Sequence, residues 1–166
     1  MVGWSDGQTV GRWMVRGSQF PVPCSLVPAM LTLTRTVTFK ASHCLRLAGL
    51  TDEENRARFG WTVDQHGHDY RVSVTVSGPQ EPGTGMVIDL VQLDHLLRDE
   101  VTAPLYGTSL NDSLPPVAAG TVLPVCETLA AWCFARIAAR LPAGVRLERV
   151  RVAEDDTLHA DCTGTA

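Results

Sequence analysis

Residues 66–76 read His-Gly-His-Asp-Tyr-Arg-Val-Ser-Val-Thr-Val. From Tyr70 to Val76 apolar side chains alternate with polar ones, and this period of two predicts a strand with one buried face and one polar face. His66 and His68 come just before the apolar run, two residues apart. On an extended chain this spacing places both imidazoles on the same side of the strand. The stretch therefore predicts both a strand of a sheet and a pair of side chains suited to a shared ligand.

The preceding segment shows the same alternation and predicts a second strand. From Leu31 to Phe39, apolar residues alternate with threonines over most of the run. After the strand of residues 70–76, a turn rich in glycine and proline spans residues 77–85. Asp89 then has the position of a helix N-cap. Helical spacing follows it at four apolar positions, Leu90, Leu93, Leu97 and Val101.

A second helix and two short strands complete the predicted order. The helix carries an apolar residue at every fourth position from Leu129 to Leu141, and Pro142 ends it. We expect the closing strands at residues 145–153 and 158–162. The order β-β-α-α-β-β predicts an α+β fold, a four-stranded antiparallel sheet with two helices on one face. Such a sheet has two exposed edges, so we expect edge-to-edge assembly of several subunits into a closed barrel.

Composition narrows the class of protein. The 166 residues suffice for one domain with a hydrophobic core, and 45% hydrophobic with 19% charged residues is unlike a disordered chain or a coiled coil. A formal net charge of −4 argues against a protein that coats nucleic acid. No apolar run is long enough to cross a membrane. Five scattered cysteines without a Cys-x-x-Cys pair, and no pattern of a signal peptide, favour a soluble cytoplasmic protein.

The first thirty residues differ from the rest of the chain. Residues 1–30 are rich in glycine and proline and show no sustained period of two or of 3.6. We expect them to be a disordered extension or translated upstream sequence, and the alternative is a lid or a partner-binding arm. Residues 31–166 are expected to form the single folded domain.

The histidines suggest a metal site. His43 comes at the end of the first predicted strand, where a neighbouring strand would place it beside His66 and His68. Three neutral imidazoles around one point form a catalytic type of zinc site with an open fourth position. The alternative is a group of polar surface histidines at a strand end. We expect His95 and His159 to face solvent.

Five blocks of the sequence, in this order, resemble the 6-pyruvoyl-tetrahydropterin synthase and 6-carboxytetrahydropterin synthase family: Phe39–His43, His66–Tyr70, Gly85–Leu90, Cys126–Thr128 and Val152–Glu154. The resemblance implies a tunnelling fold (T-fold), with trimers stacked into a homohexamer and active sites for a small-molecule substrate at subunit boundaries. It implies zinc held by three histidines that match His43, His66 and His68. A late glutamate that anchors the pterin matches Glu154, and Glu127 matches a second residue of the pocket.

The sequence departs from the family pattern at the residues that transfer protons. The family's catalytic cysteine falls on Thr62, and its Leu-Asp-His motif reads Leu105-Tyr106-Gly107. Asp64 would replace the lost base if burial raised its pKa toward neutrality. Tyr106 would act as an acid through its phenol, or Tyr106 and Trp61 would reshape the pocket for another ligand. The candidates for proton transfer are therefore Thr62, Asp64, Tyr106 and Glu127.

Three functions are consistent with these residues. The first is a zinc-dependent lyase or cyclase with altered chemistry on a small carbonyl- or hydroxyl-bearing heterocyclic metabolite, for example a ring-forming condensation of the Pictet–Spengler type in specialised metabolism. The second is a pterin side-chain lyase or synthase acting on dihydroneopterin triphosphate. The third is a zinc-binding pseudoenzyme that serves as a ligand-binding scaffold. The loss of the family's acid–base residues favours the first.

Overall fold

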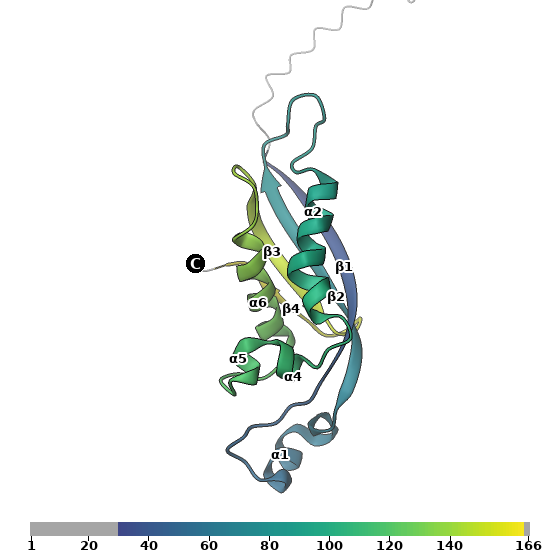
Figure 1. Cartoon of the computed structure of the whole chain (residues 1–166), viewed down its shortest axis with the longest axis vertical. Helices are drawn as coiled ribbons and strands as arrows, with labels where there is room; N and C mark the ends of the chain where they lie inside the picture. Colours follow the sequence, from purple (N-terminus) through teal and green to yellow (C-terminus); the bar gives the residue numbers. More distant parts are fainter. Residues whose placement is uncertain (1–29, 165–166) are drawn as a thin grey trace, which may run out of the picture.

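The fold is a four-stranded antiparallel sheet with helices on one face, as the computed structural model of residues 30–164 shows (Figure 1). The strands follow one another across the sheet in chain order: β1 (Leu31–His43), β2 (His66–Gly78), β3 (Arg146–Ala153) and β4 (His159–Cys162). This confirms the predicted α+β class and the antiparallel order. The predicted extension falls on residues 1–30, of which only Met30 is among the described residues.

The β1–β2 ladder sets the phase of the whole sheet. It runs without a break from the pair Leu31–Gly78 to the pair His43–His66. Because alternate side chains share a face, the phase that buries Phe39 on β1 also turns His43 to the helix side of the sheet. The same phase on β2 buries Tyr70, Val72, Val74 and Val76.

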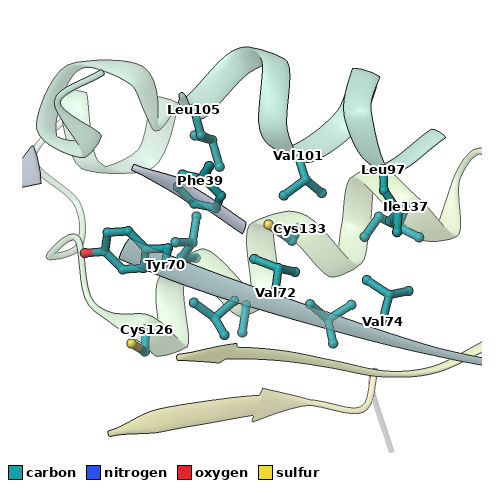
Figure 2. Packing of buried hydrophobic residues seen from close by; sticks show 14 of the residues in the cluster. Phe39, Tyr70, Val72, Val74, Leu97, Val101, Leu105, Cys126, Cys133 and Ile137 are labelled. Atoms are coloured by element: carbon teal, nitrogen blue, oxygen red, sulfur yellow. The ribbon is translucent and has the colours of Figure 1, made fainter. Parts of the chain in front are cut away.

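Two principal helices cover the apolar face, as predicted. α2 (Leu90–Leu97) begins at Asp89, whose carboxylate accepts bonds from the N–H groups of Val91 and Gln92 at 2.7 and 3.1 Å. It continues through a π-helical turn (Arg98–Thr102) into α3 (Ala103–Leu105). α6 (Cys126–Ala138) lies beside it (Figure 1). No helix within residues 30–164 has the length and apolar character needed to cross a membrane. Figure 2 shows the core between helices and sheet, with Leu97, Val101, Cys133, Ile137, Val72 and Val74 among its side chains.

Several short helices were not predicted. α1 (Asp52–Phe59) lies beyond the sheet, in the connection between β1 and β2 (Figure 1), and a 3-10 turn (Gly60–Val63) follows it. α1 begins with a capping box in which Thr51 and Glu54 satisfy each other's backbone N–H groups. α4 (Leu110–Ser113) and α5 (Pro115–Ala118) belong to the connection before α6. α1 and the 3-10 turn precede His66, the first residue of β2, so they help to position this histidine.

The other face of the sheet is polar. Thr34 Oγ1 and Thr75 Oγ1 lie 2.8 Å apart, and a guanidinium–carboxylate pair joins Arg151 to Asp161 at 2.7 Å. In the described part of the chain, the helices lie on the opposite side of the sheet (Figure 1). Hydroxyl and charged side chains on an uncovered face are what a sheet shows when that face borders water.

Candidate active site

Three histidines come together at the end of the β1–β2 ladder. His43 and His66 are direct partners in the register, and His68 follows on the same side of β2. The ring centroid of His43 lies 4.5 Å from that of His66 and 5.1 Å from that of His68. The centroids of His66 and His68 are 5.0 Å apart. One nitrogen of each ring lies within 4.8 Å of the others. The predicted convergence of these three side chains is therefore confirmed.

Backbone carbonyls orient two of the rings. His43 Nδ1 lies 2.6 Å from the carbonyl oxygen of Pro124, and His66 Nδ1 lies 2.8 Å from that of Asp64. A carbonyl oxygen only accepts hydrogen bonds, so each Nδ1 carries the proton and each Nε2 keeps a free lone pair. Metal-binding histidines are held in this way by partners of the second ring nitrogen.

The remaining nitrogens fit a metal ion. His43 Nε2 and His68 Nε2 are buried and have no hydrogen-bond partner among the described residues. Burial lowers the pKa of His43, against the opposing effect of the Pro124 carbonyl, so the ring is neutral at pH 7. Buried polar atoms are almost always paired, and a shared ion would pair these. The donor set of three neutral imidazoles is one that transition metals prefer.

A pocket of about 220 Å³ opens beside the triad. It brings together the ends of β1 and β2, the 3-10 turn, the start of α6 and the turn between β3 and β4. Three of the residues predicted for the site, Thr62, Glu127 and Glu154, are in its wall. The lining is His43, Leu45, Thr62, His66, Val125, Cys126, Glu127, Glu154, Leu158 and His159.

His159 was not predicted to be part of this pocket. Its side chain is exposed, as expected, but the tight β3–β4 turn returns it to the pocket wall near Glu154. The Asp155 carboxylate holds this turn by accepting the N–H groups of Thr157 and Leu158 at 2.6 and 2.8 Å. The two aspartates of this segment indicated a turn, but its length and direction depend on these bonds.

The acidic wall of the pocket holds a cysteine in its thiol form. Cys126 Sγ donates a weak hydrogen bond to Glu154 Oε2 at 3.8 Å. Burial, and then the charges of Glu154 and Glu127, raise the pKa of Cys126 to about 12. The nucleophile in cysteine chemistry is the thiolate, so Cys126 does not replace the cysteine that the sequence lacks at Thr62.

Thr62 and Trp61 flank the histidine triad. Thr62 Oγ1 donates to the carbonyl oxygen of Phe59 at 2.7 Å, which satisfies its hydroxyl proton within the turn. Trp61 is 66% exposed, and its ring centroid lies 4.6 Å from that of His66. The indole thus presents a bare aromatic surface next to the triad.

Asp64 does not meet the condition set for a general base. Its carboxylate is exposed and makes two bonds to the Arg56 guanidinium, at 2.9 and 3.2 Å. The Arg56 bonds lower the pKa of Asp64, which is the opposite of the rise that a general base at this position would need. The cause is the fold of α1, which places Arg56 opposite Asp64. The contribution of Asp64 to the site is its backbone carbonyl, which orients His66.

Tyr106 does not reach the triad of its own chain. It is 65% exposed and borders a separate surface depression with Thr38, Lys40 and Asp69. The next residue, Gly107, donates its N–H to the carbonyl oxygen of Lys40 at 2.7 Å, which holds this loop along the edge of β1. Tyr106 therefore lies at the β1 edge of the sheet, just before the residues that bond to Lys40 and Ser42 of that strand.

Tyr70 is a buried residue in ring contact with the triad. Its ring stacks on Phe39 at 5.3 Å, and it meets His68 and His43 edge-on at 5.6 and 6.1 Å. Its hydroxyl is buried and has no hydrogen-bond partner among the described residues. Burial, and then the charge of Glu154, raise the pKa of this phenol. The sequence pattern indicated only a core position on the strand.

A half-covered antiparallel sheet, with three converging histidines beside an acidic pocket, defines a protein of the tunnelling-fold class with a candidate metal site. The family model for 6-pyruvoyl tetrahydropterin synthase matches residues 32–165, and the chain belongs to this family. The human 6-pyruvoyl tetrahydrobiopterin synthase is 36% identical over 126 residues, which cover 75% of this chain and 85% of the human protein. That of Poecilia reticulata is also 36% identical over 126 residues, covering 75% and 84%.

Solved structures agree with this assignment. The 6-pyruvoyl tetrahydropterin synthase of Caenorhabditis elegans superposes with a TM-score of 0.72 at 25% identity, over 82% of this chain and 97% of that one. The enzyme of the same name from Plasmodium vivax superposes with a TM-score of 0.59 at 15% identity, over 81% and 97%, which shows the shared fold. The resemblance inferred from the five sequence blocks is confirmed.

Proposed function

We propose that this protein is a zinc-dependent pterin side-chain lyase or synthase that acts on 7,8-dihydroneopterin triphosphate. One observation carries the proposal: His43 and His66 line the same pocket as Glu154, and one nitrogen of His68 lies within 4.8 Å of theirs. The family and the names of the relatives support pterin chemistry over the altered lyase or cyclase chemistry that the sequence alone favours.

The triad would hold the metal. The ligands would be His43, His66 and His68, two of them with Nε2 atoms that are buried and unpaired. Zinc bound there would supply Lewis acidity toward oxygen atoms of the substrate side chain. The carbonyls of Pro124 and Asp64 keep the His43 and His66 rings in the required tautomer.

Glu154 would anchor the pterin ring. Its carboxylate is half-buried in the pocket, and Cys126 contributes only a weak bond at 3.8 Å. A carboxylate has about four acceptor sites, so lone pairs remain for two N–H groups of a guanidine-like edge. Such charge-assisted pairs are strong and directional. Trp61 would add an aromatic surface at the side of His66.

Glu127 is the proposed proton acceptor. It lines the same pocket as His43 and His66 and lies in the first turn of α6, where the helix dipole favours a carboxylate. Glu127 would take a proton from a C–H or O–H group of the substrate side chain. Thr62 contributes a polar wall, because its hydroxyl proton is already bonded to Phe59.

The assembly would be a homohexamer built from the domain of residues 31–166. β1 and β4 are the edges of the sheet, and the uncovered polar face suits the water-filled inside of a barrel. Exposed Tyr106 at the β1 edge would then lie at a subunit boundary. Native mass spectrometry should show six chains, and a monomer would contradict this assembly.

The reaction is tested with zinc-loaded protein and 7,8-dihydroneopterin triphosphate, followed by liquid chromatography and mass spectrometry. We expect product with the native chain and none with His66→Ala. His95→Ala is the matched control, because His95 is an exposed residue of α2 away from the pocket. Intact substrate with zinc-replete native protein would overturn the proposal and leave a pseudoenzyme or a different substrate.

A further inference from the structure

Tyr70 has a polar group for which the described chain provides no partner. The side chain is 1% exposed, and its hydroxyl makes no hydrogen bond among residues 30–164. A phenol is protonated at neutral pH and acts as a donor. A buried donor without an acceptor costs free energy, so such a group in a native structure calls for an explanation.

The position of this hydroxyl is defined by rigid neighbours. Phe39 stacks on the Tyr70 ring with an interplanar angle of 15°. His68 and His43 contact the ring edge-on, at 69° and 83°. Figure 2 shows the Tyr70 oxygen pointing away from Val72 and Val74, at the end of the core where Cys126 lies. A side chain held in this way cannot swing out to find water.

The surroundings of the oxygen belong to the candidate site. The triad nitrogens of His43 and His68 are buried and unpaired like the Tyr70 oxygen. Cys126 lies at the same end of the core as the Tyr70 oxygen (Figure 2), its Sγ lies 3.8 Å from Glu154 Oε2, and both residues line the pocket. One end of the sheet thus holds the Tyr70 hydroxyl donor, the Nε2 lone pairs of two histidines and the Glu154 carboxylate. The hydroxyl and the two Nε2 atoms have no hydrogen-bond partner among the described residues.

We propose that the Tyr70 hydroxyl is a ligand-positioning group, which donates a hydrogen bond to an oxygen atom of the ligand seated between the histidine triad and Glu154. The structure accounts for this hydroxyl as a preformed donor, kept unpaired in the free protein so that it pairs on binding. The site would therefore select ligands that place an oxygen atom at the metal centre. This inference rests on the metal centre of the proposed function but not on its pterin chemistry.

The test uses Tyr70→Phe, which removes one oxygen and keeps the ring. The probe is acetohydroxamate, a small ligand that binds metals through oxygen, titrated into the cobalt-loaded full chain and followed by the visible cobalt spectrum. We expect the variant to bind acetohydroxamate about three- to ten-fold more weakly, which is the effect of one lost hydrogen bond. Without metal or ligand, its unfolding midpoint should equal or exceed that of the native chain, because an unpaired buried group has been removed.

Val72→Ala is the matched control. Val72 is a fully buried residue of the same face of β2, and its truncation should lower the unfolding midpoint and leave the acetohydroxamate affinity unchanged. Equal affinity of Tyr70→Phe and the native chain would overturn the assignment. A native chain that binds no acetohydroxamate would also overturn it, since the site would then not bind the ligand oxygen that Tyr70 is proposed to contact. Failure to convert dihydroneopterin triphosphate, with the Tyr70 effect intact, would refute the pterin reaction alone.

Discussion

Replacing Glu154 by glutamine tests the anchor of the pocket. The change keeps the shape of the side chain and removes its charge. Two charge-assisted N–H bonds to a pterin would become neutral ones, each weaker by about 1 kcal/mol. The sum of about 2 kcal/mol corresponds to a roughly thirty-fold weaker dissociation constant. Because the only side-chain hydrogen bond of Glu154 within residues 30–164 is the 3.8 Å contact with Cys126, little structural stability should be lost.

Isothermal titration calorimetry of zinc-loaded protein with neopterin measures this change. Glu148→Gln is the control, because Glu148 is a carboxylate of β3, the strand that ends just before Glu154, and it bonds Ser77 and Arg146 instead of lining the pocket. Glu148→Gln should bind neopterin like the native chain. A Glu154→Gln protein whose affinity stays within two-fold of the native value would refute the role of Glu154 as the anchor.

Three further predictions concern the metal, the core and the pocket thiol. With zinc about 1,000-fold above its dissociation constant, chemical denaturation should show that zinc raises the unfolding free energy of the native chain by about 4 kcal/mol. In His66→Ala, an about 100-fold loss of zinc affinity would reduce this gain to about 1.4 kcal/mol. An undiminished gain in the variant would contradict the histidine triad as the metal site. Glu100→Gln should cost about 2 kcal/mol in the same assay, because buried Glu100 bonds Arg136 at 2.6 Å, and an unchanged midpoint would contradict this. Cys126, with a pKa raised to about 12, should resist iodoacetamide at pH 8 and react only as the pH approaches that value; prompt labelling detected by mass spectrometry would show a thiolate.

Local sequence patterns predicted the parts of the fold that follow from one period. The alternation in residues 31–39 and 70–76 predicted β1 and β2, and the N-cap at Asp89 predicted the start of α2. The spacing of His66 and His68 placed both on one face, and the strand pairing then brought His43 to them. These predictions succeeded because period and strand register are nearly local properties.

The features that the sequence pattern left open depend on particular side-chain contacts. The pKa of Asp64 is set by Arg56, a residue of a helix that the periodicity did not reveal. The place of His159 in the pocket depends on a turn held by Asp155. Tyr70 looked like an ordinary core residue because strand alternation shows which side is buried, but not whether a hydroxyl there finds a partner.

X-ray absorption at the zinc edge of the loaded protein tests the central claim most directly. The account predicts one zinc per chain, with three imidazole nitrogens at about 2.0 Å and an additional light atom in the open position. It also predicts no sulfur ligand, since the candidate ligand atoms that converge within the described residues are those of three histidines and of no cysteine. A sulfur shell at about 2.3 Å, or a first shell without imidazole, would contradict the assignment of His43, His66 and His68 as the metal ligands.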